Sequence, residues 1–497
     1  MTEPAPVKSL AALGLTAQGG GDAEVLGLSV DSRKTRPGHL FAALPGSKIH
    51  GAEFIQYALR MGAVAVLTDP EGARLAFDVL EEDPDVALVV TEDPRAALAY
   101  AAALFYGRQP RVMVAVTGTN GKTSVASFTR QIWHLLGHEA ANIGTTGVEG
   151  AFSAPSSHTT PEPITLHALL ADMAGHGVTH AAMEASSHGL AQRRLDGVHL
   201  GAAGFTNFTQ DHLDYHASFE EYFAAKEGLF SRVLPDDGVA VIATDDPKGW
   251  SLARACEARG QAVLTVGRDE DCALRIIAQR FGATGQELRF HWKKKPQQAR
   301  LNLIGGFQAD NVLVAAGLAI ATGSDPQSVF DTFDDLGTVR GRMQRVAKRS
   351  NGAAVFVDYA HTPDAVATAL KALRPHVMGR IVVVLGAGGD RDKTKRPLMG
   401  RAAAENADVV IVTDDNPRSE NPAAIRAMVM AGCPEATEVG DRAEAILRGV
   451  DMLEAGDALL IAGKGHETGQ VIGDDVLPFD DAEQASVAVA ALEGRLA

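Results

Sequence analysis

Cysteine is scarce in this chain: its 497 residues include only Cys256, Cys272 and Cys433. The wide spacing of these residues argues against a disulfide framework or a zinc ribbon, and it fits a reducing cytoplasm. Long apolar runs are lacking as well, since no stretch of about 18 apolar residues occurs. Residues 1–10 have no apolar core of signal-peptide length. We therefore expect a cytoplasmic protein without a membrane span.

An excess of positive charge is also lacking, because the formal net charge is −16. This balance argues against a nucleic-acid partner held by a broad basic surface. The binding site of any anionic substrate would need local arginines and helix N-termini, because the negative charge of the whole protein repels anions. The apolar content of 46% and the charged content of 22% are typical of globular proteins. The chain is too long for one core, so its size predicts about two to four domains.

Short apolar runs alternate with helical patterns along most of the chain, which predicts an α/β fold with mostly parallel sheets covered on both faces. Breaks near 107–110 and 336–345 divide it into three predicted domains, 1–107, 108–337 and 338–497. The stretch 273–303 alternates apolar and polar residues as strands do. The predicted strands are 63–67, 86–90, 112–116, 180–183, 201–205, 238–243, 262–266, 354–357, 381–385, 409–412 and 458–461, and the predicted helices are 70–80, 94–106, 124–136, 164–174, 218–229, 363–373, 397–406 and 422–430.

A glycine-rich turn between the third predicted strand and its helix has the pattern of a phosphate-binding loop. Gly118 and Gly121 would let backbone N–H groups approach phosphate oxygens, and the helix N-terminus would add partial positive charge. We expect Lys122 to neutralise phosphates and Thr123 to offer its hydroxyl to Mg²⁺. Val116 stands where the strict pattern has glycine, so a plain strand–helix turn is the alternative.

Acidic residues follow two further strands of this central region. Glu184 comes at the carboxyl end of the predicted strand 180–183, where parallel sheets bind ligands, and we expect it to hold Mg²⁺. A helix-capping role is the alternative for this residue. The segment 211–216 holds two His and two Asp, which suits metal or phosphate chemistry. His212 is an atypical Mg²⁺ ligand, and a polar surface loop explains the segment equally well.

The predicted helix 218–229 carries a lysine on its apolar stripe. Ser218 followed by Glu221 fits a capping box. Lys226 shares the stripe with aromatic residues, although lysine is rarely buried without a partner. From composition alone, the default explanation is a lysine that snorkels to the surface.

Four charged loops follow four strands of the C-terminal region, at 358–364, 386–393, 414–418 and 463–467. Each loop alone could be a solvated turn. The carboxyl ends of parallel strands share one edge of a sheet, so we expect these loops to form a single binding face.

Over essentially its whole length, the chain resembles the Mur ligase family. The motifs that carry the resemblance are the phosphate loop, Glu184-Ala185-Ser186-Ser187, Asp211-His212-Leu213-Asp214, Tyr222 to Lys226, Asn311, Arg342, Asp358-Tyr359-Ala360-His361 and Gly463-Lys464-Gly465-His466-Glu467. Asp31-Ser32-Arg33, His158-Thr159-Thr160-Pro161 and the stretch 186–194 resemble the branch that forms the UDP-muramoyl tripeptide. Asp415-Asn416-Pro417-Arg418 resembles the form that adds meso-diaminopimelate.

The resemblance implies an ATP-dependent ligase of peptidoglycan precursor synthesis that is assisted by Mg²⁺. Such an enzyme adds meso-diaminopimelate to UDP-N-acetylmuramoyl-L-alanyl-D-glutamate through an acyl phosphate. It would have an N-terminal UDP-substrate domain, a central P-loop mononucleotide-binding domain and a C-terminal Rossmann-like domain for the amino acid. The expected partners are these small molecules alone, bound by a monomer.

The resemblance also implies residue roles. Lys122, Glu184, His212 and Lys226 would be catalytic, and Lys226 resembles a carbamylated lysine. ATP would be bound by Gly118, Thr119, Asn120, Gly121, Lys122, Thr123, Asn311 and Arg342, and metal by Thr123, Glu184, His212 and the Lys226 carbamate. The UDP substrate would contact Val30, Ser32, His158, Thr159, Thr160, Ser186, Gln192 and Arg194. Diaminopimelate would contact Arg391, Asp415, Asn416, Pro417, Arg418, Gly463 and Glu467.

Three alternatives stay open. A lysine-adding ligase of the same branch, or a related ligase such as folylpolyglutamate synthase, would share most motifs, although Asp31-Ser32-Arg33 and Asp415-Asn416-Pro417-Arg418 disfavour the synthase. A P-loop protein that uses ATP as a switch would not need the amino-acid rim, by which we mean the binding face with Arg391, Asp415 to Arg418 and Glu467. Gln308 stands where family members commonly carry Asn. This difference affects the expected contacts with the adenine of ATP and not the expected activity.

Overall fold

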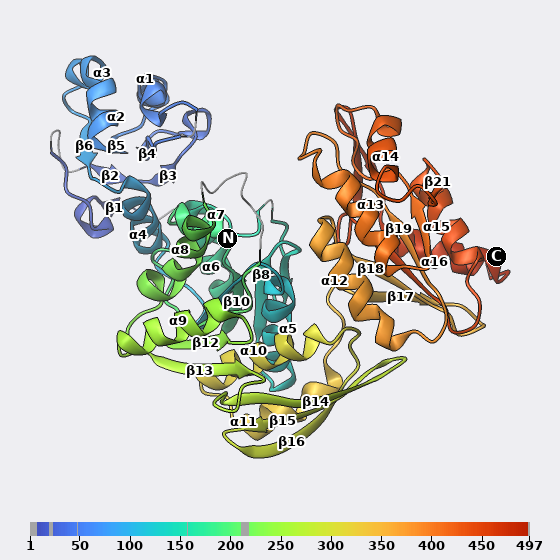
Figure 1. Cartoon of the computed structure of the whole chain (residues 1–497). Helices are drawn as coiled ribbons and strands as arrows, with labels where there is room; N and C mark the ends of the chain where they lie inside the picture. The colour runs from blue at the N-terminus through green and yellow to red at the C-terminus, as the bar shows by residue number, and fades with distance from the viewer. Residues whose placement is uncertain (1–6, 19–22, 47, 157, 210–217, 496–497) are drawn as a thin grey trace. The chain divides into compact units, whose positions relative to one another are not determined.

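The computed structural model describes residues 7–18, 23–46, 48–156, 158–209 and 218–495 (Figure 1). The chain forms two compact units, Met1–Cys272 with Val314–Val329, and Ala273–Leu313 with Phe330–Ala497. The chain passes between the units after Cys272 and again within helices α10 (Phe307–Ala321) and α11 (Pro326–Asp331). No helix in the described ranges is long and apolar enough to cross a membrane.

The first unit begins with a small parallel sheet of order β3-β4-β5-β6. Helix α4 starts where Asp93 accepts a hydrogen bond from the N–H of Ala96 at 3.0 Å, and Pro94 takes the first helical position. The elements are β1 (Lys8–Ser9), β2 (Glu24–Val25), β3 (Gly27–Ser29), β4 (His39–Ala42), β5 (Ala65–Thr68), β6 (Ala87–Val90), α1 (Ile55–Arg60), α2 (Pro70–Leu75), α3 (Phe77–Glu82) and α4 (Pro94–Tyr106).

A larger sheet in the same unit runs in the order β13-β12-β11-β7-β10-β8-β9. Every neighbouring pair is parallel except β8 and β9. The strands are β7 (Val112–Thr117), β8 (Ala140–Gly144), β9 (Gly147–Gly150), β10 (His180–Glu184), β11 (Ala202–Phe205), β12 (Val239–Ala243) and β13 (Ala262–Gly267), and the helices are α5 (Lys122–Leu135), α6 (Pro163–Gly175), α7 (Ser187–Ala191), α8 (Phe219–Gly228) and α9 (Pro247–Ala258).

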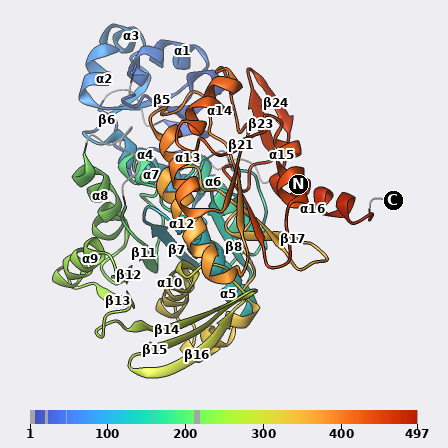
Figure 2. The same ribbon diagram turned by 45° about the vertical axis from the view of Figure 1, so that its right-hand side comes forward.

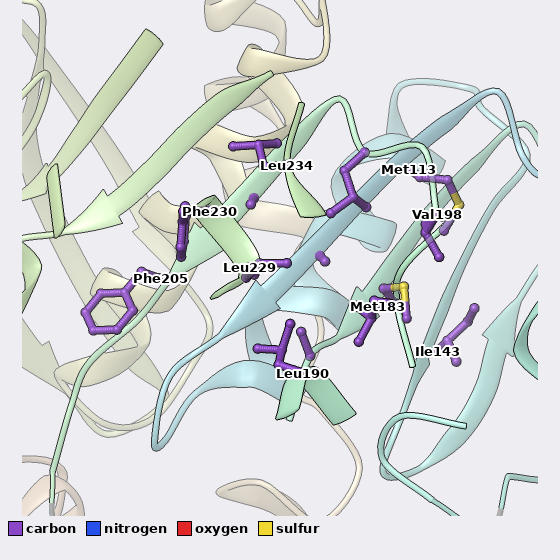
Figure 3. Packing of buried hydrophobic residues seen from close by; sticks show 14 of the residues in the cluster. Met113, Ile143, Met183, Leu190, Val198, Phe205, Leu229, Phe230 and Leu234 are labelled. Atoms are coloured by element: carbon purple, nitrogen blue, oxygen red, sulfur yellow. The ribbon is translucent and has the colours of Figure 1, made fainter. Parts of the chain in front are cut away.

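A buried apolar cluster joins this sheet to its helices (Figure 3). Met113, Ile143 and Met183 come from the neighbouring strands β7, β8 and β10, and none of them has measurable solvent exposure. Phe205 of β11 and Phe230, in the π-helical segment Leu229–Val233 that continues α8, extend the cluster along the sheet. Burial of such side chains is the main favourable term that holds the sheet and its helices together.

The second unit begins with an antiparallel ladder of β14 (Leu274–Gly282), β15 (Gly285–Trp292) and β16 (Lys295–Leu301). A six-stranded sheet of order β17-β18-β22-β19-β20-β21 follows, parallel except for β17. Its elements are β17 (Gln344–Lys348), β18 (Ala354–Asp358), β19 (Ile381–Leu385), β20 (Val409–Val412), β21 (Thr437–Glu438), β22 (Ala458–Ala462), the hairpin β23 (Gly469–Ile472) and β24 (Asp475–Pro478), α12 (Pro363–Leu373), α13 (Lys395–Asn406), α14 (Pro422–Met430), α15 (Arg442–Asp451) and α16 (Asp481–Leu492).

The two faces of this sheet are covered by different helices, as Figures 1 and 2 show. Val383 of β19 packs with residues of α12, α13 and α14, whereas its neighbour Val384 packs with residues of α15 and α16. Successive side chains of a strand point to opposite faces, so a strand buried on both faces is apolar at every position. This is the reason the sequence 381–385 reads as an unbroken apolar run.

The predicted fold class is confirmed, since both units are α/β and their large sheets are mostly parallel. The alternating stretch 273–303 forms the antiparallel ladder. One predicted helix, 70–80, is wrong as a single element, because it is divided into α2 and α3 at Ala76. Ala76 takes φ −100° and is buried in the cluster around Phe41. Tertiary packing has overridden the local helical periodicity there.

A buried ion pair joins two helices of the second unit. Arg442 of α15 donates from Nε and Nη2 to the two carboxylate oxygens of Asp481 of α16, each at 2.7 Å, and both side chains are 0% exposed. Asp481→Ala would leave the guanidinium buried without its carboxylate. We expect the free energy of unfolding to fall by about 3–5 kcal/mol, measured by urea denaturation.

The matched control is Glu444→Ala, which removes the exposed partner of Arg448 on the same helix α15. That change should cost less than about 1 kcal/mol. Equal losses in the two variants would contradict a special role for the buried pair.

Candidate active site

The phosphate loop lies between β7 and α5, as its sequence predicts. Gly118 has φ 145° and Gly121 has φ 89°, both in the region that favours glycine. A Cβ at Gly118 would lie 1.9 Å from the hydroxyl oxygen of Thr206, so no larger residue fits there. Gly121 caps α5 without a side chain. The loop backbone is therefore free of the bulk that would keep a phosphate away.

Two lysines converge on one carbonyl of this loop. Lys122 Nζ donates to Gly118 O at 2.9 Å and to Thr119 O at 2.8 Å, and Lys226 Nζ donates to the same Gly118 O at 2.7 Å. The Lys226 ammonium also lies 4.4 Å from the ring centroid of Tyr222. Two cations that share an acceptor repel each other in a site with little water. The loop thus concentrates positive charge where a polyphosphate would bind.

The structure rejects a snorkelling Lys226, because its side chain is only 1% exposed. The predicted cap of its helix is present, since Ser218 Oγ accepts a hydrogen bond from Glu221 N at 3.1 Å. Aromatic packing explains the burial: Tyr222 and Phe230 on the same stripe are 0% exposed. The polar end of Lys226 reaches the phosphate loop and not the surface.

Glu184 lies at the centre of a hydrogen-bond network at the carboxyl end of β10. Its Oε2 accepts from the hydroxyl of Thr123 at 3.0 Å, and its Oε1 accepts from Thr145 N at 2.7 Å. Ser186, not Glu184, caps the following helix α7, so the capping alternative is wrong. A Cβ at Gly144 would lie 2.0 Å from Glu184 Oε1. The carboxylate and the Thr123 hydroxyl are together an oxygen-rich pair of the kind that Mg²⁺ prefers.

Residues predicted to hold the UDP substrate form a second network beside Glu184. Thr160 Oγ1 donates to Glu184 O at 2.9 Å and lies 3.2 Å from Ser186 Oγ. Arg194 Nη1 donates to Thr160 O at 2.7 Å, and Arg194 Nη2 donates to Gln192 Oε1 at 2.8 Å. Thr159 joins through its hydroxyl, 3.1 Å from that of Thr145. These residues are therefore neighbours in space.

The remaining predicted residues of the first unit are placed less centrally. Ser32 is buried and Val30 is exposed, and both follow β3 of the N-terminal sheet and not the central sheet. His158 is exposed. Thr119 Oγ1 donates to Thr209 O at 3.1 Å, which ties the phosphate loop to the segment after β11. The predictions for His212 and its acidic neighbours lie outside the described residues.

In the second unit, the four predicted loops meet at one edge of the six-stranded sheet. Gly463 N donates to Asp358 O at 3.2 Å, and Asn416 Nδ2 donates to Glu467 Oε2 at 2.9 Å. Arg418 Nη1 donates to Gly389 O at 2.8 Å. The contacts join loops that are far apart in sequence, because their parallel strands end at the same edge.

Acidic groups at this edge are partly shielded from water. Burial, and then the nearby Asp415 carboxylate, raises the pKa of Glu467 above its usual value. Burial also raises the pKa of Asp358, whose Oδ2 accepts from Met343 N at 2.7 Å. Burial lowers the pKa of His466 to about 4, so its imidazole is neutral near pH 7. A ligand ammonium would find partly desolvated carboxylates here, where charge pairing is stronger than in bulk water.

Arg418 adopts an unusual backbone conformation, with φ 51°. Its N–H donates to Val471 O at 3.0 Å, and its carbonyl accepts from Gly473 N at 2.8 Å. The hairpin β23–β24 therefore holds this strained residue, as is common at functional sites. Arg391, by contrast, is exposed, and its Nη1 donates to Asp390 O at 3.1 Å.

Residues predicted to contact the nucleotide also occur in the second unit. Asn311 Nδ2 donates to the Oε1 of Gln308 at 3.1 Å. The unusual glutamine therefore contacts a residue that is predicted to bind the nucleotide. The Arg342 guanidinium lies 4.7 Å from the ring centroid of Tyr359.

Sequence reasoning missed several residues of these networks. Thr145 lies beside Glu184, Lys464 and Arg442 are buried at the edge where the four C-terminal loops meet, and Glu420 pairs with the buried Arg396. Lys464 stands inside the motif 463–467, so its presence there was a usable signal. The others are single charged or hydroxyl residues without any local pattern.

Gly144→Ala tests the position of Glu184. The new methyl group would push the carboxylate off Thr145 N, and a charge-assisted hydrogen bond is worth about 1.5–3 kcal/mol. We expect binding of MgATP to weaken about tenfold or more, measured by titration calorimetry. Gly175→Ala is the control, since a Cβ there meets nothing within 4 Å. Unchanged affinity in Gly144→Ala would argue against a role for Glu184 in binding.

Relatives of this chain share most of its length. It is 52% identical over 473 residues to the UDP-N-acetylmuramoyl-L-alanyl-D-glutamate–2,6-diaminopimelate ligase of Bradyrhizobium diazoefficiens, covering 94% of this chain and 95% of that one. It is 50% identical to the ligase of the same name from Agrobacterium fabrum, covering 95% of each chain.

Solved structures give the same picture. A structure of UDP-N-acetylmuramoyl-L-alanyl-D-glutamate–2,6-diaminopimelate ligase superposes with a TM-score of 0.71 at 32% identity, covering 98% of this chain and 100% of that chain. A folylpolyglutamate synthase of Mycobacterium tuberculosis bound to ADP has a TM-score of 0.62 at 20% identity, covering 75% of this chain and 92% of that chain. At that identity, the second likeness shows the fold alone.

Three family descriptions match consecutive parts of the chain. Residues 24–106 match the Mur ligase family catalytic domain, residues 116–319 the Mur ligase middle domain, and residues 341–465 the Mur ligase glutamate ligase domain. Relatives that are about 50% identical in sequence cover nearly the full length of this chain. These matches together show that the chain belongs to the Mur ligase family.

Proposed function

We propose that this chain is an ATP-dependent ligase that joins meso-diaminopimelate to the glutamyl carboxylate of UDP-N-acetylmuramoyl-L-alanyl-D-glutamate. The observation that carries the proposal is Arg418 at the strand-end rim, in a chain 52% identical to a ligase named for this reaction. The same chain carries the phosphate loop that an ATP-consuming ligase requires. Peptidoglycan precursor synthesis is the pathway to which such a product belongs.

The reaction needs ATP because amide formation from a carboxylate and an amine is uphill in water. Transfer of the γ-phosphoryl group to the glutamyl carboxylate gives an acyl phosphate, which the amine of diaminopimelate attacks. A tetrahedral intermediate forms and phosphate leaves. The protein contributes positioning and charge neutralisation, which are the main catalytic effects in reactions of this kind.

The phosphate loop would perform the first task. Its backbone N–H groups and the start of α5 face bound phosphates, and Lys122 neutralises charge that would otherwise repel the glutamyl carboxylate. Lys122 now donates to two loop carbonyls, so it must turn from them to reach a phosphate.

The residues around Glu184 fit a magnesium ion. Thr123, Glu184 and a carbamylated Lys226 would supply oxygen ligands, and His212 is the further ligand that the resemblance implies. A bound Mg²⁺ would screen the negative charges of ATP and the carboxylate from each other. Carbamylation converts Lys226 from a cation into an anion, which also removes its repulsion with Lys122 at Gly118 O.

The substrates would occupy the two networks already described. Thr159, Thr160, Ser186, Gln192 and Arg194, with His158, Val30 and Ser32, would hold the UDP-muramoyl dipeptide. Asn311 and Arg342 would hold the nucleotide together with the phosphate loop. Arg391, Asp415, Asn416, Pro417, Arg418, Gly463 and Glu467 would hold the amino acid.

Two related activities are weaker candidates. A lysine-adding ligase would have no use for a guanidinium at position 418, because lysine lacks a second carboxylate. The likeness to folylpolyglutamate synthase reaches the fold only. A monomeric state and a cytoplasmic location stay predictions, which gel filtration and cell fractionation would measure.

ATP turnover should require both co-substrates. We expect phosphate release only when the UDP-muramoyl dipeptide and diaminopimelate are both present, because the acyl phosphate must meet an amine. Lys122→Ala should lower the rate about 10²-fold or more by removing charge stabilisation. Lys371→Ala, on the exposed face of α12, is the control. Release of phosphate from ATP alone at the full rate would favour an ATP switch protein.

Lys226 should carry a carbamate in the active enzyme. A neutral amine must add CO₂, so alkaline, bicarbonate-containing buffer should favour the modification. We expect Lys226→Ala to be nearly inactive and to be partly restored by small carboxylates that replace the missing anion. Labelling with ¹³C-bicarbonate should give a carbamate signal by NMR.

Lys248→Ala is the matched control, since Lys248 also contacts an aromatic ring, that of Phe223, at 4.7 Å. This variant should keep both the activity and the carbamate signal. A high-resolution map of the nucleotide-bound enzyme with a bare ammonium at Lys226 would refute the modification.

Diaminopimelate should be strongly preferred over lysine. Its distal carboxylate can pair with the planar Arg418 guanidinium, and Asp415 and Glu467 can hold the distal ammonium. Lysine leaves the guanidinium without a carboxylate, so we expect selectivity of about 10³-fold or more. Arg418→Ala should raise the KM for diaminopimelate steeply and that for ATP little.

Competition between the two amino acids measures the preference directly, and Arg401→Ala on the exposed face of α13 is the control. Comparable incorporation of lysine by the unmodified protein would overturn the assignment of diaminopimelate.

A further inference from the structure

Lys464 is a buried cation beneath the amino-acid rim to which the proposed mechanism gives no task. It follows β22, and its side chain is 0% exposed. Its Nζ donates to Asn416 Oδ1 and to Gly469 O, each at 2.8 Å. The carboxylates of Asp415 and Glu467 lie further away, at 3.6 and 3.9 Å. A lysine is almost never buried this completely unless its partners compensate the desolvation.

The contacts of Lys464 decide how the Asn416 amide is turned. Asn416 Oδ1 accepts from Lys464 Nζ and from Val471 N at 3.0 Å, so Nδ2 is left to donate to Glu467 Oε2 at 2.9 Å. A flipped amide would set its NH₂ group against an ammonium and a backbone N–H, which are all donors. The cation thus keeps a donor directed at the Glu467 carboxylate.

The same ammonium also anchors the hairpin that shapes Arg418. Gly469 is the first residue of β23, and two residues later Val471 accepts from the N–H of Arg418 at 3.0 Å. Arg418 needs this support because its φ is 51°. Lys464 therefore contacts the supports of both the carboxylate Glu467 and the guanidinium Arg418.

We propose that Lys464 is a positioning residue for the amino acid: through the Asn416 amide and the β23–β24 hairpin it aligns Glu467 and Arg418 with the two charged groups at the far end of the ligand. The inference rests on the proposed function for the identity of that ligand. A residue with this role affects recognition of the amino acid and leaves the recognition of ATP and of the UDP substrate alone.

Kinetics of Lys464→Met test the role, because methionine keeps a similar length and removes all three donors. We expect the KM for diaminopimelate to rise about tenfold to a hundredfold, as for loss of a charge-assisted hydrogen bond. The KM for ATP and that for the UDP-muramoyl dipeptide should stay within about threefold. Lys464→Gln, which keeps one donor toward Asn416, should show a smaller rise and covers the case in which Lys464→Met fails to fold.

A double-mutant cycle asks whether Lys464 acts through Asn416. If it does, Asn416→Ala combined with either Lys464 variant should raise the KM for diaminopimelate little more than Asn416→Ala alone. Additive effects in this cycle, or equal rises in the KM values of all three substrates, would overturn the inference and leave a purely structural lysine.

Crystal structures of the Lys464 variants decide the inference without any reaction. We expect the Asn416 amide to rotate, or its hydrogen bond to Glu467 to be lost. An Asn416–Glu467 contact and an Arg418 conformation unchanged from those described would refute the positioning role, whatever the substrate. Failure of the proposed function is seen separately, as phosphate release by the unmodified enzyme that does not depend on diaminopimelate.

Discussion

The parallel direction of the strands is the constraint on which both candidate sites depend. In each unit, the loops that follow neighbouring parallel strands emerge at the same edge of a sheet. Gly118 after β7 and Glu184 at the end of β10 come to the same edge in this way, as do Asp358 at the end of β18 and Gly463 after β22. Antiparallel pairing would have placed the loops of each pair at opposite edges.

Positive charges are placed locally at the candidate sites, although the molecule as a whole is negatively charged. The chain has a formal net charge of −16, yet its proposed substrates are anions. Lys226 and Lys464 are each no more than 1% exposed, and each reaches backbone carbonyls or amides of a loop. Burial makes such charges effective because water does not screen them. It also makes each one costly unless its hydrogen bonds are complete.

The family assignment and the geometry support each other at different levels. Identity near 50% over almost the whole chain places it among the ligases, and the likeness to folylpolyglutamate synthase shows that the fold alone does not choose the substrate. We propose that specificity comes from side chains such as Arg418 at the strand-end edge of the second unit. The Gln308–Asn311 contact shows how one added methylene is accommodated, since the two amides bond to each other.

The sequence by itself determined the fold class and most of the secondary structure, because parallel strands buried on both faces, such as 381–385, are apolar throughout and their helices are periodic. Glycine at 118 and 121 and the Lys-Thr pair were also sufficient to locate the phosphate loop. The sequence could not show that helix 70–80 divides at Ala76, since a buried contact with another segment decides that break.

Only the tertiary structure decided the side-chain partners. Composition favoured a snorkelling Lys226, whereas the fold brings its Nζ to Gly118 O, 108 positions away in sequence. The tasks of Thr145 and Arg442 were likewise invisible, because a single residue has no periodicity and its partner is distant along the chain. Local patterns encode which elements form, but charge pairing and hydrogen bonding depend on distances that exist only after the strands have assembled.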